Sequence, residues 1–182
     1  MISRAHGIIL ASTTQWSRSA QIGRPFKTEL LSLGSTYRWS LALDISRLAE
    51  QLESTRSRPL LVVGSGGSQS TAHLIANLHM NRFGQLSKAE TPLLATSDLN
   101  RLKSCGVLLV SASGRNPDIL GVARAAVRAE PPVLLALCAA QGSPLATVVQ
   151  SFSRGFCFEF DLPTGKDGFL QPTVFLRLAS LR

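Results

Sequence analysis

Apolar runs alternate along the chain with stretches of helical periodicity. Three continuous runs, 60–63, 107–110 and 133–139, each have the length of a short strand buried on both faces. A fourth segment, 156–162, alternates apolar and polar positions, which is typical of a strand near the edge of a sheet. Residues 91–96 are the candidate for one further short strand, the second along the chain.

Between these runs, apolar residues recur every three to four positions, which predicts amphipathic helices. Ser35 or Thr36 is expected to cap the first helix, and Gly84 fits the end of the second. Asn116 and Pro117 together fit the start of the third, as cap and first-turn residue. The predicted helices cover 35–54, 71–83, 118–129, 145–149 and 169–182, with a polar or helical turn at 99–104.

Alternating strands and helices, with strands that are apolar on both faces, indicate an α/β fold. Its parallel sheet would be covered by helices on both sides. In such sheets ligands bind beyond the carboxyl ends of the strands. Two turns rich in glycine and serine, 64–70 and 111–116, each follow a predicted strand. We therefore expect both turns to lie at that edge, where they could converge on one ligand.

These turns suit a phosphate group, because they offer backbone N–H and hydroxyl donors beside small side chains. The alternative is that they only connect strands to helices. A dinucleotide fingerprint begins at Gly64 and Gly66, but Gln69 stands where its last glycine would be. A phosphate-binding Walker loop is excluded because Asp167 follows Gly165-Lys166. Gly66-Gly67-Ser68 is not a nucleophile elbow either, because Ser70, and not a glycine, stands two positions after Ser68.

The composition is that of one domain with a sizeable core. The chain has 182 residues, 45% of them hydrophobic, and no apolar stretch reaches the length of a membrane span. We expect a soluble protein without membrane contact. The net charge of +8 favours anionic ligands. The basic residues are scattered and do not interleave with aromatic ones, so specific nucleic-acid binding is not expected.

Cysteine and histidine positions give no sign of a metal site. Cys105, Cys138 and Cys157 are far apart, odd in number and without a Cys-x-x-Cys pair. They are predicted to be small core residues in a reducing, cytoplasmic compartment. His73 and His79 are six positions apart, on nearly opposite sides of a helix. We expect no metal and no cofactor.

Four stretches carry a family resemblance: VVGSGGSQSTA at 62–72, LLVSASGRNPDIL at 108–120, the turn at 143–146 and GKDGFL at 165–170. They resemble the SIS (sugar isomerase) domain family of phosphosugar-binding proteins. The resemblance implies a three-layer α-β-α sandwich of Rossmann type with a five-stranded parallel sheet. It divides the chain into a poorly defined segment at 1–34 and an SIS-like domain at 35–182, truncated at its C-terminal end.

The resemblance also implies that both turns contact the ligand, the second one through the phosphate. Arg115 stands where the family often has an acidic residue, and it would either strengthen anion binding or face solvent. Lys166 and Asp167 would lie near the ligand or in a solvated loop. The predicted ligand- and phosphate-binding residues are Ser65, Gly66, Gly67, Ser68, Ser111, Ser113, Gly114 and Asn116.

Three functions stay open. The first is binding of a phosphorylated sugar or another carbohydrate derivative. The second is an aldose–ketose isomerase completed by a partner subunit or a missing segment, because the family's catalytic residues lie largely beyond the fifth strand. The third is a regulatory ligand sensor. The acids of the last strand, Glu159 and Asp161, are expected to be solvated, so the catalytic residues stay unknown. A homo-oligomer, in the simplest case a dimer, is expected.

Overall fold

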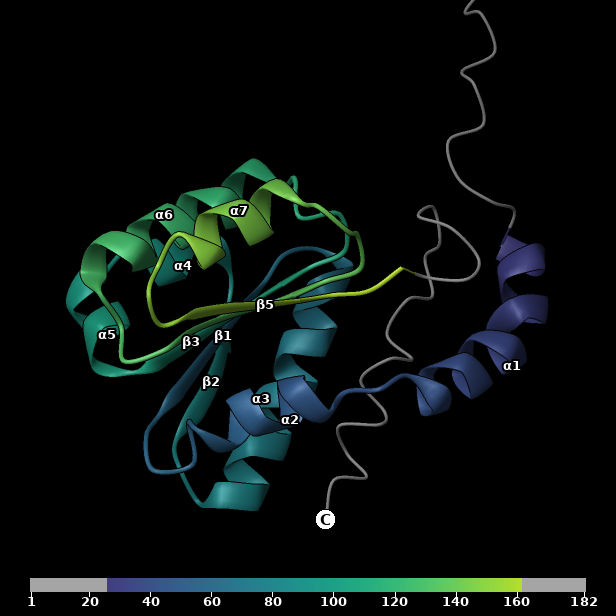
Figure 1. Ribbon diagram of the computed structural model, residues 1–182, viewed down its shortest axis with the longest axis horizontal. Coiled ribbons are helices and arrows are strands. Elements are labelled where there is room, and N and C mark those ends of the chain that lie inside the picture. Colours follow the sequence, from purple (N-terminus) through teal and green to yellow (C-terminus); the bar gives the residue numbers. More distant parts are fainter. Residues whose placement is uncertain (1–25, 162–182) are drawn as a thin grey trace, which may run out of the picture.

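Five short strands form one all-parallel sheet in the order β2-β1-β3-β4-β5 (Figure 1). The computed structural model describes residues 26–161. Every position of β1, β3 and β4 is buried, as their continuous apolar sequences predict. The α/β fold with a five-stranded parallel sheet is therefore confirmed. The strands are β1 Leu60–Gly64, β2 Ser87–Glu90, β3 Gly106–Ser111, β4 Leu134–Cys138 and β5 Gly155–Glu159.

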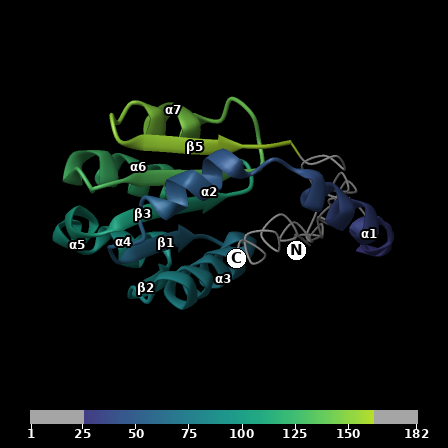
Figure 2. The ribbon, with the colours of Figure 1, turned by 60° about the horizontal axis from the view of Figure 1, so that its bottom comes forward.

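Helices cover both faces of the sheet, and one further helix lies beside it (Figure 2). One apolar core lies between the sheet and α4, α5, α6 and α7, and a second lies between the sheet and α2 and α3. This is the three-layer sandwich that the resemblance implied. The helices are α1 Phe26–Ala42, α2 Ser46–Glu53, α3 Gly67–Phe83, α4 Pro92–Thr96, α5 Leu99–Ser104, α6 Pro117–Ala129 and α7 Pro144–Gln150.

The single helix predicted over 35–54 is wrong, because the chain turns between α1 and α2. The Asp44 carboxylate accepts hydrogen bonds from the backbone N–H of Ser46 at 3.0 Å and from its hydroxyl at 2.6 Å. Such a side-chain bond offers the backbone an alternative to the helix. The apolar periodicity continues through the turn, so the sequence pattern does not reveal it.

The strand predicted over 91–96 is also wrong, because these residues form α4 and the strand β2 precedes them. Pro92 occupies the first turn of α4, where its missing N–H is not needed. The sequence of β2, Ser-Lys-Ala-Glu, is polar because the strand lies at the edge of the sheet. It therefore leaves no apolar run to detect.

The predicted helix ends differ in outcome. Asn116 caps α6, since its side-chain oxygen accepts from two N–H groups of the first turn, and Gly84 ends α3 with a φ of 67°. These two predictions are confirmed. Ser35 and Thr36 lie inside α1, where their hydroxyls donate to the carbonyl of Ser32, so neither caps a helix.

Some predictions fall outside the described residues. These are the helix at 169–182, the loop residues Lys166 and Asp167, and most of the segment 1–34. None of the helices within residues 26–161 is long and apolar enough to cross a membrane.

Candidate functional site

The two glycine- and serine-rich turns begin side by side at one edge of the sheet. Strands β1 and β3 are parallel neighbours, with Gly64 opposite Val110. Because both strands end at this edge, the turns 64–70 and 111–116 leave it next to each other. Ligands of open parallel sheets bind at this edge.

The first turn depends on glycine at two positions. A Cβ at Gly64 would lie 2.5 Å from the Ser68 carbonyl oxygen, so the strand end packs directly against the first turn of α3. Gly66 has a φ of 56°, in the left-handed region that favours glycine. The N–H groups of Ser68 and Gln69 bond back to the carbonyls of Ser65 and Gly66. The N-terminus of α3, with its partial positive charge, therefore follows within three residues of the strand.

The second turn is held together by its own side chains. The buried Ser111 hydroxyl accepts a hydrogen bond from the backbone N–H of Gly114 at 3.0 Å. The Ser113 hydroxyl accepts one from the backbone N–H of Arg115 at 3.3 Å. A hydroxyl that accepts still has a proton to donate. The Asn116 side-chain oxygen is engaged in the cap of α6. Ser113 and Arg115 are exposed, whereas Ser111 shapes the turn from within.

A third turn, between β4 and α7, packs against the second. A Cβ at Gly114 would meet Ser143 at 2.5 Å, and the φ of Gly114 is 64°. Glu159 reaches this turn from the end of β5, where its carboxylate accepts from the N–H groups of Gly142 at 3.2 Å and Ser143 at 2.9 Å. Glu159 is therefore half-buried and hydrogen-bonded, which corrects the expectation that it is solvated. Asp161 is exposed, as expected.

Gln69 links the first turn to the edge strand. With its amide nitrogen facing the two carbonyls, it donates to Gly64 at 2.5 Å and to Glu90 at 3.2 Å. One side chain thereby joins the carboxyl ends of β1 and β2. In the sequence Gln69 was informative only as the residue that breaks the dinucleotide fingerprint.

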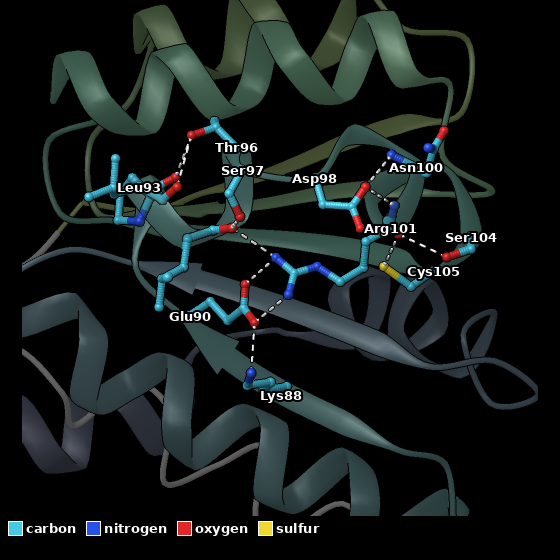
Figure 3. Close-up of polar contacts among 12 residues, drawn as sticks. Lys88, Glu90, Leu93, Thr96, Ser97, Asp98, Asn100, Arg101, Ser104 and Cys105 are labelled. Carbon is cyan, nitrogen blue, oxygen red and sulfur yellow. Dashed lines mark hydrogen bonds and ion pairs between the residues drawn. The ribbon is translucent and has the colours of Figure 1, made fainter.

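A buried ion pair fixes the edge strand to the helices beyond it (Figure 3). The side chain of Glu90 is 1% exposed and accepts two hydrogen bonds from Arg101, at 2.7 and 2.6 Å. The same guanidinium donates to the carbonyl of Leu94 at 2.8 Å, and Lys88 lies 3.0 Å from the carboxylate. These contacts join β2, α4 and α5. No spacing in the sequence singles out this pair.

His79 has a structural environment, far along α3 from the turns. Its ring nitrogens lie 2.8 Å from the Thr55 hydroxyl and 2.7 Å from the Ser87 hydroxyl, and its ring packs edge-on against Phe83. Burial lowers the pKa of His79 from its ordinary value of 6.5, and a contact with the Thr55 backbone partly offsets this effect. His73, on the same helix, is exposed.

The lowered pKa of His79 predicts a loss of stability in acid. The unfolded histidine keeps its ordinary pKa, so below about pH 6.5 the unfolded chain binds more protons than the folded one. We expect the free energy of unfolding to fall as the pH drops through this range, and to fall less in His79→Gln. Urea unfolding at several pH values measures it, with His73→Gln as the matched control. A His79→Gln protein with the wild-type pH dependence would contradict the prediction.

The three cysteines are buried, as predicted. Burial raises the pKa of the Cys105 thiol and, more strongly, that of Cys157. Protonated thiols are poor nucleophiles and poor metal ligands. Within the described part of the chain, no group of three or more His, Cys, Asp or Glu side chains could hold a metal ion.

Solved structures of several proteins share this architecture. The Vibrio vulnificus NanR protein complexed with ManNAc-6P superposes with a TM-score of 0.68 and 20% identity, covering 85% of this chain and 59% of that one. E. coli CFT073 c3406 in complex with A5P superposes with a TM-score of 0.68 and 18% identity, covering 85% of this chain and 84% of that one. Tagatose-6-phosphate ketose/aldose isomerase from Escherichia coli superposes with a TM-score of 0.61 and 16% identity, covering 87% of this chain and 47% of that one. The fold is that of the SIS domain.

The SIS-domain fold agrees with the resemblance seen in the sequence motifs. The present chain spans 59% of the NanR protein and about half of the tagatose-6-phosphate isomerase. No protein-family model matches the sequence, and no curated protein sequence is similar to it. The likeness is therefore one of three-dimensional structure.

Proposed function

We propose that the protein binds a phosphorylated sugar, or a related carbohydrate derivative, between its two glycine- and serine-rich turns. The observation that carries this proposal is their adjacency at the carboxyl ends of β1 and β3. Two structures with the same fold, NanR and c3406, are complexes with ManNAc-6P and A5P. The proposed ligand-binding residues are Ser65, Gly66, Gly67, Ser68, Ser111, Ser113, Gly114 and Asn116.

The donors at this edge suit an oxyanion. The N-terminus of α3 contributes a partial positive charge, and the exposed Ser113 hydroxyl has a proton to donate. The exposed Arg115 lies two residues after Ser113 and adds a cation to the second turn. Phosphate oxygens only accept hydrogen bonds, so they match such a set of donors. The net charge of +8 would attract the same ligands over longer distances.

A thermal-shift titration with a panel of sugar phosphates tests the proposal. A ligand at a hundred times its Kd stabilises the folded state by about 2.7 kcal/mol. We expect a clear rise in Tm with at least one sugar phosphate, and loss of that rise in Ser113→Ala. Inorganic phosphate and NAD serve as ligand controls.

Ser153→Ala is the matched protein control for this titration. Ser153 is also an exposed turn serine, but it lies before β5, at the opposite end of the strands. It should keep the wild-type shift. An unchanged Tm with every sugar phosphate, or an equal shift in Ser113→Ala and wild type, would contradict the proposal.

The alternative is an aldose–ketose isomerase completed by a partner subunit. His73 favours it, because this exposed imidazole lies on α3 one turn beyond Gln69, with its Nε2 3.4 Å from the Gln69 side-chain amide. Isomerisation needs a base to move a proton between two carbons, and histidine is the commonest such base. We expect any turnover to be lost in His73→Ala and kept in His79→Gln. Turnover that survives in His73→Ala would exclude this histidine as the base.

A further inference from the structure

A hollow of about 620 Å³ lies at the amino ends of β1 and β2, at the opposite end of the strands from the glycine- and serine-rich turns. The last turns of α2 and α3 form it, together with the segments that lead from these helices into the two strands. Its volume is that of a site for a small molecule. Within the described part of the chain, its lining residues are Glu53, Arg56, Ser57, Arg82, Phe83 and Gln85.

Two guanidinium groups share one carboxylate in this hollow, which leaves one positive charge in excess. Glu53 lies 3.9 Å from Arg56 and 3.5 Å from Arg82, measured between the nearest oxygen and nitrogen atoms. Charge-assisted hydrogen bonds of this kind are usually about 2.7–2.9 Å long. The buried pair of Glu90 and Arg101 is closer still, at 2.6 Å. The carboxylate of Glu53 therefore spans both arginines without a close bond to either.

The guanidinium of Arg82 is also positioned by an aromatic ring. Its central carbon lies 5.4 Å from the centroid of the Phe83 ring, within the range of a cation–π contact. The Phe83 ring packs edge-on against His79, which is only 4% exposed. A guanidinium that is already oriented loses less side-chain entropy when it binds a ligand, and its planar fork matches the oxygens of a carboxylate or phosphate.

We propose that the hollow binds a small organic molecule through an oxyanion, a phosphate or carboxylate group, which replaces Glu53 beside Arg56 and Arg82. Glu53 and Arg82 are 46% and 40% exposed, and Arg56 is 71% exposed. Ion pairs as exposed as these contribute little to stability, so giving them up costs little. The Ser57 hydroxyl and the Gln85 amide supply uncharged hydrogen-bonding groups for the rest of the molecule.

A titration followed by proton–nitrogen NMR correlation spectra tests where an oxyanion binds. The probes are phenyl phosphate and benzoate, which carry the two kinds of oxyanion on the same ring and so distinguish them. We expect at least one probe to shift the backbone amide signals of residues 53–57 and 82–85. Shifts confined to residues 64–70 and 111–116, or no shifts with either probe, would overturn the proposal.

Two substitutions should change the affinity for the probe in opposite directions. Glu53→Gln should tighten binding severalfold, because the competing carboxylate is removed. Arg82→Gln should weaken binding about tenfold, because a charge-assisted hydrogen bond is lost. Glu130→Gln is the matched control for net charge, since Glu130 is an exposed acid that ends α6 on the other face of the sheet. It should bind the probe as the wild type does.

The outcome of these substitutions decides the proposal. Equal affinities in Glu53→Gln, Arg82→Gln and wild type would overturn it, and would leave the arginines with the role of offsetting the C-terminal dipoles of α2 and α3. The Ser113→Ala variant should keep the shifts at residues 53–57 and 82–85. Failure of this inference and failure of the proposed function are therefore distinguishable, because they concern opposite ends of the strands.

Discussion

Replacing Arg101 by methionine is expected to lower the free energy of unfolding by about 3 kcal/mol, the lower end of the usual cost of breaking a buried ion pair, because Arg101 is itself 35% exposed and Lys88 still reaches the carboxylate. The variant would leave the Glu90 carboxylate inside the protein without its bidentate partner. The Leu94 carbonyl would lose a donor as well. Chemical denaturation at neutral pH measures the change.

Lys88→Met is the control for this prediction. Lys88 contacts the same carboxylate but is 69% exposed, so its loss should cost about 1 kcal/mol or less. Combining Glu90→Gln with Arg101→Met should recover much of the lost stability, because no buried charge then lacks a partner. An Arg101→Met protein as stable as Lys88→Met would show that the pair does not hold the edge strand.

Gly114→Ala is expected to cost about 2–5 kcal/mol, the sum of a left-handed backbone penalty and an overpacking penalty. The φ of Gly114 is 64°, and a Cβ there would meet Ser143 at 2.5 Å and the Cys138 sulfur at 2.8 Å. The second and third turns would be forced apart. If the second turn binds sugar phosphates, as we propose, that binding should weaken along with stability. Denaturation and ligand titration measure the two effects separately.

Gly142→Ala separates the two penalties. Its φ of 59° is as unfavourable for alanine, but a Cβ there meets nothing within 4 Å. It should cost only the backbone part, about 1–2 kcal/mol. Equal costs for the two variants would mean that the contact between the turns contributes nothing.

The sequence predicts the sheet well where the strands are buried on both faces. The runs that became β1, β3 and β4 are continuous and apolar because helices cover both their sides. Strand β2 was missed, since an edge position lets its sequence be polar. The break between α1 and α2 was missed because it depends on one side chain, Asp44, in an otherwise unbroken apolar periodicity.

The candidate site was predictable only in its local parts. Both turns follow apolar strands, so their positions and their small residues could be read from the sequence. Contacts between distant segments could not be predicted, because neither partner is unusual alone. Glu159 meets Gly142 and Ser143 across 16 to 17 residues, and Arg101 meets Glu90 across 11. Nothing in the neighbouring sequence marks Glu90 as buried or Glu159 as half-buried.

The carboxylate of Glu159 makes the electrostatic potential differ between the two sides of the sheet edge at which the strands end. It satisfies N–H groups of the third turn with the protein's own anion, on the side of β4 and β5. The N-terminus of α3 lies on the opposite side, beyond β1. The anionic end of a ligand would be repelled from the side of β4 and β5, where Glu159 lies, and attracted to the side of β1, where α3 begins. Such a ligand should therefore bind in one orientation, with its anionic group toward β1 and β3.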